Sequence, residues 1–320
     1  MRDFCVVFGH ALLNLENAGT GTLSVSMVRN IIYAFHMPLF MMISGYLYRK
    51  AYFTDQGKPK SERIKRQIFN IVIVYLVYSL LLGISKLPFE RYVNGPSSIS
   101  DILLIPVKPF QLYWYLYALI ILYLIFLLKV FRGKYALPVS VILCAMSQLV
   151  EIDYFAIKSV LYYSLFFCIG IKLCKYGEKI FENYKALIFA GAAVSIALMF
   201  AFGKSKHLYK DIPGINMIVG AAISLFVIFV FKNSRRFGEN KVLVYLGKHS
   251  MEIYLVHTYF TTVSKIVLNR IIGQYEWLQI VLMTACGIIG SVLVGEICSR
   301  IKISNIVFHP ITLFEKKTEI

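Results

Sequence analysis

Residues 34–47 read AFHMPLFMMISGYL, and they contain the features on which the fold assignment depends. The stretch is apolar enough for lipid, yet it holds His36, Pro38 and the pair Ser44–Gly45. Proline removes a backbone donor and disfavours helix at the residue before it. We therefore predict a membrane segment that opens near His36 and breaks just after it. Neighbouring helices can satisfy the backbone groups that such a kink leaves without partners.

The composition of the whole chain supports a membrane protein. Of its 320 residues, 58% are hydrophobic and only 16% are charged, whereas a soluble domain has about 45–50% apolar and about 25% charged residues. The apolar residues form long runs separated by polar segments. We therefore predict an all-α fold, a polytopic transmembrane helix bundle of about ten helices.

The predicted spans are the recurring apolar runs of roughly the length that crosses a bilayer. They lie near residues 4–15, 28–48, 68–86, 111–130, 137–150, 159–174, 186–203, 214–232, 243–264 and 277–298. No soluble segment is long enough for a second domain, so we expect one membrane domain over residues 1–320.

The first predicted span is unusually short. A dozen helical residues cover about 18 Å, well below the roughly 30 Å of a bilayer core. Either this helix is buried against its neighbours or a natural segment precedes Met1, and we favour a truncated first helix.

The positive charges predict the topology and exclude one class of partner. The chain carries a net charge of +17, and most of its 34 basic residues fall in alternate loops and in the C-terminal tail. The positive-inside rule then places both termini in the cytoplasm. The same distribution accounts for the net charge, so we expect a lipid bilayer rather than nucleic acid around this protein.

The six cysteines are scattered through apolar runs and form no Cys-x-x-Cys pair. They indicate neither a disulfide framework nor a zinc site. No other ligand cluster suggests a metal, and we expect small buried side chains.

Titratable groups at membrane depth are costly, so each one is a functional candidate. His10 lies in the first predicted span, with Asn14 one turn later on the same face. His36 lies in the second span. A neutral imidazole can take a proton near pH 7, which makes His10 a candidate general base. The alternative is a packed polar side chain in the helix core.

The segment LGKHSMEIYLVH, residues 246–257, carries a second polar group. Glu252 follows Lys248 by four residues and can simply pair with it. His257 shares a helix face with Tyr254 and Ser250, at spacings of three and seven. An interhelical hydrogen bond is the alternative to a catalytic role for His257.

These segments together resemble the acyltransferase-3 family of integral-membrane acyltransferases. The matching features are Gly-His in the first span, FHMPLFMMISGYL, the basic turn RIKRQ at 63–67, LYWYLYALIILYL at 112–124 and LGKHSMEIYLVH. They cover nearly the whole chain in the family's order. This chain lacks two features of the family pattern. The first is a basic residue about ten positions before the first histidine, and the second is a proline after the basic turn, where Asn70 stands.

The resemblance implies an enzyme of the bacterial cytoplasmic membrane. Such an enzyme transfers an acetyl group from cytoplasmic acetyl-CoA to hydroxyls of a cell-surface glycan or lipid-linked saccharide. His10 and His36 match the family's histidines and are the expected catalytic residues. Arg63 and Arg66, with the adjacent Lys65, match the basic turn expected to bind CoA phosphates, although ordinary positive-inside anchoring explains the same charges.

Further contributions to the site are expected from aromatic residues. Tyr113 or Trp114, together with His36, are candidate donors to a tetrahedral oxyanion. The sequence shows no local Ser-His-Asp arrangement, so direct transfer and an acyl-enzyme both stay open.

Two other functions fit the residues. Ten spans with broken helices also describe a transporter or a flippase for a lipid-linked glycan or a small solute. The sequence shows no inverted repeat and few membrane acids for proton coupling, which disfavours a carrier. A membrane domain that binds a glycan without chemistry is the third alternative. The acceptor and the oligomeric state are not specified by the sequence.

Overall fold

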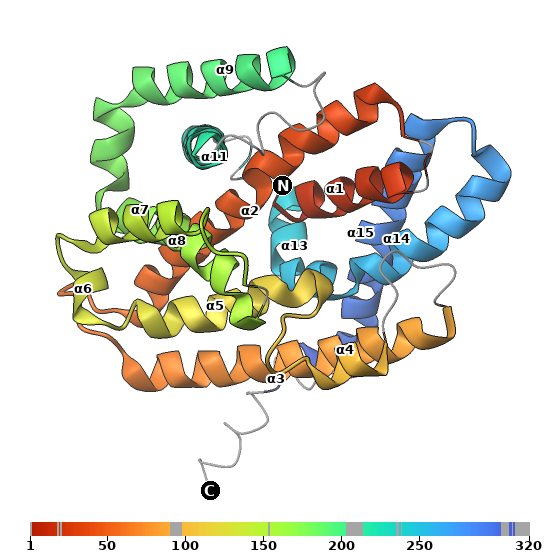
Figure 1. The fold of residues 1–320 in the computed structure, drawn as a ribbon, viewed down its shortest axis with the longest axis horizontal. Coiled ribbons are helices and arrows are strands. Elements are labelled where there is room, and N and C mark those ends of the chain that lie inside the picture. The colour runs from red at the N-terminus through yellow and green to blue at the C-terminus, as the bar shows by residue number, and fades with distance from the viewer. Residues whose placement is uncertain are drawn as a thin grey trace, which may run out of the picture. The chain divides into compact units, whose positions relative to one another are not determined.

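The computed structural model describes residues 2–17, 19, 21–89, 98–152, 154–202, 214–234, 237, 239–301, 307, 308 and 310. These residues form helices and no strand, apart from one isolated bridge between Phe53 and Pro59. The α-helices, labelled in Figure 1 where there is room, are α1 (Arg2–Asn17), α2 (Leu23–Tyr52), α3 (Ser61–Lys86), α4 (Ile99–Leu103), α5 (Trp114–Ile125), α6 (Lys129–Arg132), α7 (Ala136–Met146), α8 (Ile157–Asn183), α9 (Lys185–Phe202), α11 (Ile215–Asn233), α13 (Lys241–Lys248), α14 (Ser250–Ile272) and α15 (Glu276–Arg300). Short 3-10 helices are η1 (Leu87–Phe89), η2 (Gln111–Tyr113) and η3 (Tyr154–Ala156).

The all-helical prediction is confirmed, whereas the count of about ten helices is not. The described residues contain 13 α-helices. Each predicted span overlaps a helix, but three differ from the prediction. The span at 111–130 is interrupted by a turn at 126–128 between α5 and α6, the span at 137–150 runs past the end of α7, and the span at 243–264 is divided at His249 into α13 and α14. Two short helices, α4 and α6, join longer ones and carry too few apolar residues to be detected as spans.

Five helices of the described chain are long and apolar enough to cross a membrane: α2, α3, α8 with the η3 turn before it, α11 and α15. Shorter apolar helices are α5 with η2, α7 and α9. Large apolar side chains stay exposed along these helices, among them Leu81, Ile142, Val194, Ile218 and Ile289. So much apolar surface is expected where lipid covers it, and the chain is a multi-pass membrane protein.

The predicted break after His36 is wrong. Helix α2 runs without interruption through Pro38 for 30 residues, so His36 lies near its middle rather than at its start. A neighbouring helix assists the backbone at this point, because Ser224 of α11 donates a hydrogen bond to the carbonyl of Phe35 at 3.2 Å. Proline is tolerated in membrane helices where such a neighbour supplies a donor.

The described residues cluster into two compact units, and the boundary between them falls inside α2, between Met37 and Pro38. The first unit contains α1, the start of α2, most of α9, and the helices α11, α13, α14 and α15. The second contains the rest of α2 and the helices from α3 to α8.

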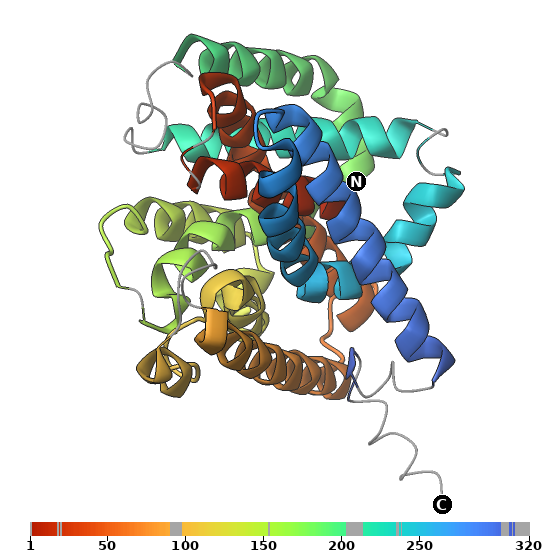
Figure 2. The ribbon, with the colours of Figure 1, turned by 90° about the vertical axis from the view of Figure 1, so that its right-hand side faces the viewer.

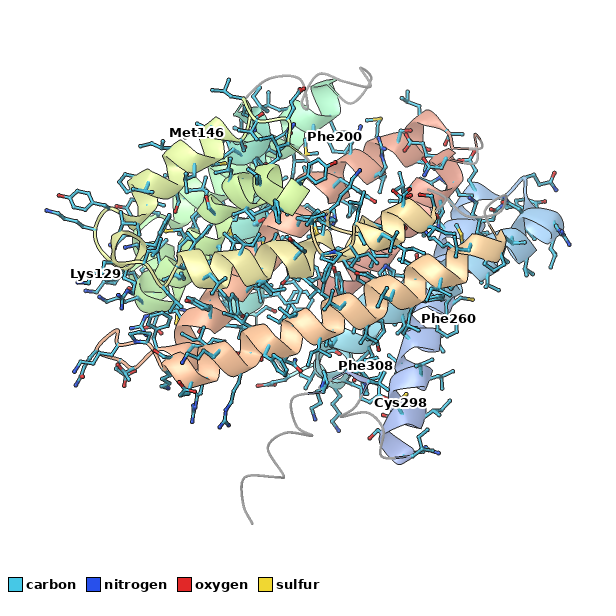
Figure 3. All side chains as sticks on the ribbon, turned by 60° about the horizontal axis from the view of Figure 1, so that its bottom comes forward. Lys129, Met146, Phe200, Phe260, Cys298 and Phe308 are labelled. Carbon is cyan, nitrogen blue, oxygen red and sulfur yellow. The ribbon has the colours of Figure 1, made fainter. Side chains whose placement is uncertain are left out.

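In the first unit, α1 lies against α14 and α15 (Figures 1 and 2). One apolar cluster of buried side chains lies here, formed by Ala11, Leu12 and Leu15 of α1, Val25 of α2, and Ile280 and Met283 of α15. Glycines bring α14 and α15 close together, since a methyl group on Gly290 would lie 2.4 Å from the ring of Phe260, which Figure 3 labels. A methyl on Gly287 would meet Val7 and Thr261 in the same way. Small residues at helix contacts are typical of membrane bundles.

In the second unit, glycines bring α2 and α8 into backbone contact. A methyl group on Gly45 would lie 2.0 Å from the carbonyl oxygen of Phe167, and one on Gly170 would lie 1.9 Å from that of Met42. Ser44 is buried beside this contact and its hydroxyl lies 2.6 Å from that of Tyr115. The pair Ser44–Gly45 therefore serves helix packing. Phe308, labelled in Figure 3, stacks on Tyr78 within the same unit.

Candidate active site

Two histidines from distant parts of the chain meet in the first unit. His10 of α1 and His257 of α14 have ring centroids 5.2 Å apart, with the rings tilted by 48°. His257 is fully buried and His10 is half-buried. Gly9 lets α1 approach α2 beside this pair, since a methyl group there would lie 3.2 Å from the ring of Tyr33.

The hydrogen bonds of His257 determine its tautomer. Its Nδ1 lies 2.7 Å from the carbonyl oxygen of Ile253 and 3.0 Å from that of Tyr254. A carbonyl can only accept, so Nδ1 carries the proton and donates. The other ring nitrogen, Nε2, is buried and has no hydrogen-bond partner among the described residues. A neutral imidazole in this state presents a free lone pair, which is what a general base needs.

An acidic residue, Asp3, lies near His257 in the same unit. Ser250 donates a hydrogen bond to Asp3 Oδ2 at 2.7 Å, and Asp3 is only 5% exposed. The Asp3 carboxylate is close enough to His257 to interact with it electrostatically. Sequence analysis missed Asp3, because an acid in the first turn of a helix is common for reasons of helix stability alone.

Glu252 does not pair with Lys248 as the sequence spacing suggested. Its Oε1 lies 3.7 Å from Nδ1 of His249, and its Oε2 is buried with no hydrogen-bond partner among the described residues. Glu296 Oε1 lies 3.4 Å from Nε2 of His249 and accepts a hydrogen bond from Tyr245 at 2.8 Å. His249, which lies between α13 and α14, is therefore the partner of Glu252 in place of Lys248.

Asn14 is half-buried on α1, one turn after His10. Beyond it, Glu16 forms a salt bridge of 2.6 Å with Arg29 of α2 and accepts a hydrogen bond from Ser26. Sequence spacing could not reveal this pair, since its members lie on different helices.

His36 is also held in place by a hydrogen bond within its own helix. It is 7% exposed, its Nδ1 donates to the carbonyl of Ile32 at 2.8 Å, and its ring meets Tyr33 edge-on at 4.8 Å. The structure therefore places a buried imidazole, with a proton on Nδ1, on α2 within the first unit.

Tyr113 and Trp114 belong to the second unit, where both make packing contacts. Tyr113 is fully buried and meets Tyr78 edge-on, and Trp114 stacks on Tyr163 with ring centroids 5.2 Å apart. The expected oxyanion role of these two residues stays a prediction.

The basic turn begins α3. Arg63, Lys65 and Arg66 are all exposed there, and Lys65 forms a surface ion pair with Glu62 at 3.0 Å. The turn is an open, charged helix surface.

A cavity of about 580 Å³ in the second unit carries further positive charge. Its basic lining residues are Arg49, Arg132, Lys134, Lys172 and Lys175. They lie in α2, α6 and α8 and in the loop after α6, in segments that sequence analysis had treated only as topology signals. In the described part of the chain, no three His, Cys, Asp or Glu side chains gather as a metal site would require.

The fold and these sites define a class: a multi-pass membrane protein in which two histidines from distant helices lie side by side. The chain belongs to the acyltransferase-3 family, because that family's model, described as an acyltransferase domain, matches residues 4–296. The protein is therefore an acyltransferase of the membrane. Family membership decides for group transfer and against the carrier alternative.

Two curated relatives are nodulation proteins NolL. The one from Sinorhizobium fredii (strain NBRC 101917 / NGR234) is 26% identical over 275 residues, which cover 78% of this chain and 73% of the relative. The one from Mesorhizobium japonicum (strain LMG 29417 / CECT 9101 / MAFF 303099) is 25% identical over 221 residues, covering 65% of this chain and 55% of the relative. No solved structure matches the chain.

Proposed function

We propose that this protein transfers an acetyl group from acetyl-CoA to a hydroxyl of a cell-surface glycan or a lipid-linked saccharide. The observation that carries the proposal is the His10–His257 pair, in which a buried Nε2 has no hydrogen-bond partner among the described residues. An ester-forming transfer needs such a group, because a sugar hydroxyl attacks a thioester slowly until its proton is taken.

The reaction balances without a further reagent. The acceptor oxygen forms a bond to the thioester carbonyl carbon, the carbon–sulfur bond breaks, and the acceptor's proton ends on the CoA thiol. An imidazole can hold that proton between the two events. His257 has the lone pair for this step, and His10 is its neighbour on the less buried side, where it can relay a proton or contact the acceptor.

We propose Tyr113 or Trp114, together with His36, as donors to the oxyanion of the tetrahedral intermediate. Because Nδ1 of His36 already donates to the carbonyl of Ile32, His36 would donate to the oxyanion from Nε2 and only as an imidazolium. Both direct transfer and an acyl-enzyme fit this set of groups. Support for the assignment comes from the residue types and, for His36, from burial near Tyr33.

The proposed location is the bacterial cytoplasmic membrane, with both termini in the cytoplasm. Support comes from the alternation of basic loops along the chain. Acetyl-CoA would then approach from the side on which the basic loops lie, and the acceptor from the other.

Acetyl transfer by membrane vesicles tests the function. Vesicles containing the protein receive acetyl-CoA labelled in its acetyl group, and label is counted in extracted lipid-linked and polymeric saccharides while free thiol is followed in parallel. We expect label that depends on the protein and falls at least about 10²-fold in His10→Ala. Cys5→Ala is the matched control, because Cys5 is a buried residue of the same helix.

Saccharide export without any acylation would instead support a carrier. Unchanged label in a correctly folded His10→Ala protein would remove His10 from the mechanism.

A further inference from the structure

The basic cavity of the second unit has no role in the histidine chemistry. Its walls come from three stretches of chain: residues 48–57 at the end of α2 and after it, residues 126–136 from just after α5 to the start of α7, and residues 168–176 of α8. Its volume of about 580 Å³ falls within the roughly 300–1,000 Å³ usual for small-molecule sites.

The cations of this cavity lack acidic partners. None of its basic lining residues forms an ion pair with a carboxylate among the described residues. Arg49 donates to the backbone carbonyls of Thr54 and Asp55, which orients the guanidinium without neutralising it. No acidic residue is among the described residues that line the cavity. Concentrated like charge in a concave site raises the local concentration of anions.

The same cavity has an aromatic wall. Tyr48, Phe53, Phe126 and Phe131 all line it. They pack on one another, with Phe126 and Phe131 at 4.7 Å and Tyr48 and Phe53 at 5.2 Å between ring centroids. These four rings are buried and make the wall rigid, whereas Tyr176, which also lines the cavity, has an exposed ring. Tyr48 also donates a hydrogen bond to the carbonyl of Tyr123, which holds its ring in place. Rigid aromatic faces stack on planar bases, and arginine side chains bind phosphates through paired hydrogen bonds.

We propose that this cavity binds an adenine nucleotide with several phosphates, namely the adenosine bisphosphate end of the acyl donor. Arg132 and Lys172 hold the phosphates, and the ring of Tyr176, which is 41% exposed and lines the cavity, accepts the base. The inference rests on the proposed function for the identity of the donor. It moves the donor site from the exposed turn at the start of α3 to a cavity that sequence reasoning did not find.

Another anion could fill the same cavity. An anionic lipid headgroup shares the phosphate chemistry but lacks the planar base, and loop cations near a membrane surface attract such headgroups. The two sources differ in what competes for the site, so one binding experiment separates them.

The test measures binding of adenosine 3′,5′-bisphosphate to the full-length protein in phosphatidylcholine nanodiscs, by calorimetry. The variant is Arg132→Gln/Lys172→Gln. The control is Lys129→Gln/Lys179→Gln, which removes the same charge from the same two helices at exposed residues outside the cavity. We expect the dissociation constant to rise at least tenfold in the variant and less than twofold in the control.

Three results would overturn the proposal: no binding to the wild-type protein, equal losses in variant and control, or inorganic pyrophosphate binding as tightly as the nucleotide. Anionic lipid in the nanodisc is a fourth test. If it abolishes nucleotide binding and acts through Arg132 and Lys172, the cavity binds a lipid headgroup and the proposal is also overturned.

Acetyl transfer is measured separately on the same proteins, so that the two proposals can fail independently. Nucleotide binding through the cavity without any acetyl transfer would refute the proposed function and leave the cavity assignment in place. Acetyl transfer with an unchanged KM for acetyl-CoA in the cavity variant would refute the cavity assignment and leave the proposed function in place.

Discussion

The two units of this acyltransferase hold their polar groups in opposite ways. In the first unit, the imidazoles of His36 and His257 are buried, and each donates one ring N–H to a carbonyl of its own helix. In the second unit, cations surround a cavity and have no carboxylate partner among the described residues. Buried, oriented groups suit proton transfer, whereas unpaired cations suit attraction of an anion. On the two proposals above, the first unit would carry the chemical step and the second would bind the acyl donor.

The largest effect is expected at His257. Replacement by Asn keeps an N–H group that can donate to the Ile253 carbonyl but removes the lone pair of Nε2. We expect the rate of acetyl transfer to fall by about 10²–10⁴-fold, with the KM for acetyl-CoA nearly unchanged. Steady-state kinetics in vesicles measure both constants, and the melting temperature of the detergent-solubilised protein checks folding. A near-normal rate would make His257 a packing residue.

The packing of the second unit is tested at Gly170. A methyl group there would lie 1.9 Å from the carbonyl oxygen of Met42, so α2 and α8 must separate in Gly170→Ala. We expect a loss of about 3 kcal/mol in stability, seen as a lower melting temperature or poor recovery of folded protein.

Gly177→Ala is the matched control on the same helix, since its nearest atoms would lie 3.9 Å away. Equal melting temperatures for the two variants would contradict the backbone contact between α2 and α8.

A smaller effect is expected at Asp3. Asp3→Asn keeps an acceptor for the Ser250 hydroxyl but removes the negative charge near His257. We expect about a tenfold lower kcat, because a hydrogen bond or contact to a charged group contributes about 1.5–3 kcal/mol. Ser250→Ala, which removes the bond and keeps the charge, should retain more activity. The reverse order would show that Asp3 acts through helix packing alone.

The smallest effect is expected at the basic turn. Arg63 and Arg66 are exposed, and exposed charges are screened by salt. Arg63→Gln/Arg66→Gln should therefore raise the KM for acetyl-CoA less than about threefold at physiological salt. A larger rise than that of the cavity variant Arg132→Gln/Lys172→Gln would return donor binding to the turn.

Most of the helical content could be predicted from apolar run lengths, because about 20 apolar residues are needed to cross a bilayer. The prediction failed where run length does not decide the structure. At Pro38 the helix continues, with a donor from α11 on the nearby carbonyl of Phe35, and at His249 a short turn divides one apolar run into two helices. The local sequence indicates neither the donor from α11 nor the turn at His249.

The candidate site was predicted in its parts and not in its arrangement. His10 and His257 are both conspicuous in the sequence, since titratable groups in apolar runs are costly. Their pairing joins helices separated by well over two hundred residues. Asp3 looked like an ordinary first-turn acid until Ser250 was found beside it.

The sequence by itself determined that this is a helical membrane protein of the acyltransferase-3 type, because hydropathy and motif order are local properties of the chain. The tertiary structure alone decided which imidazole nitrogen is free, which acid lies beside it, and which of many basic residues line one cavity. Those properties depend on side chains brought together from distant helices, through glycine contacts as close as that between Gly45 and Phe167. No spacing along the chain encodes them.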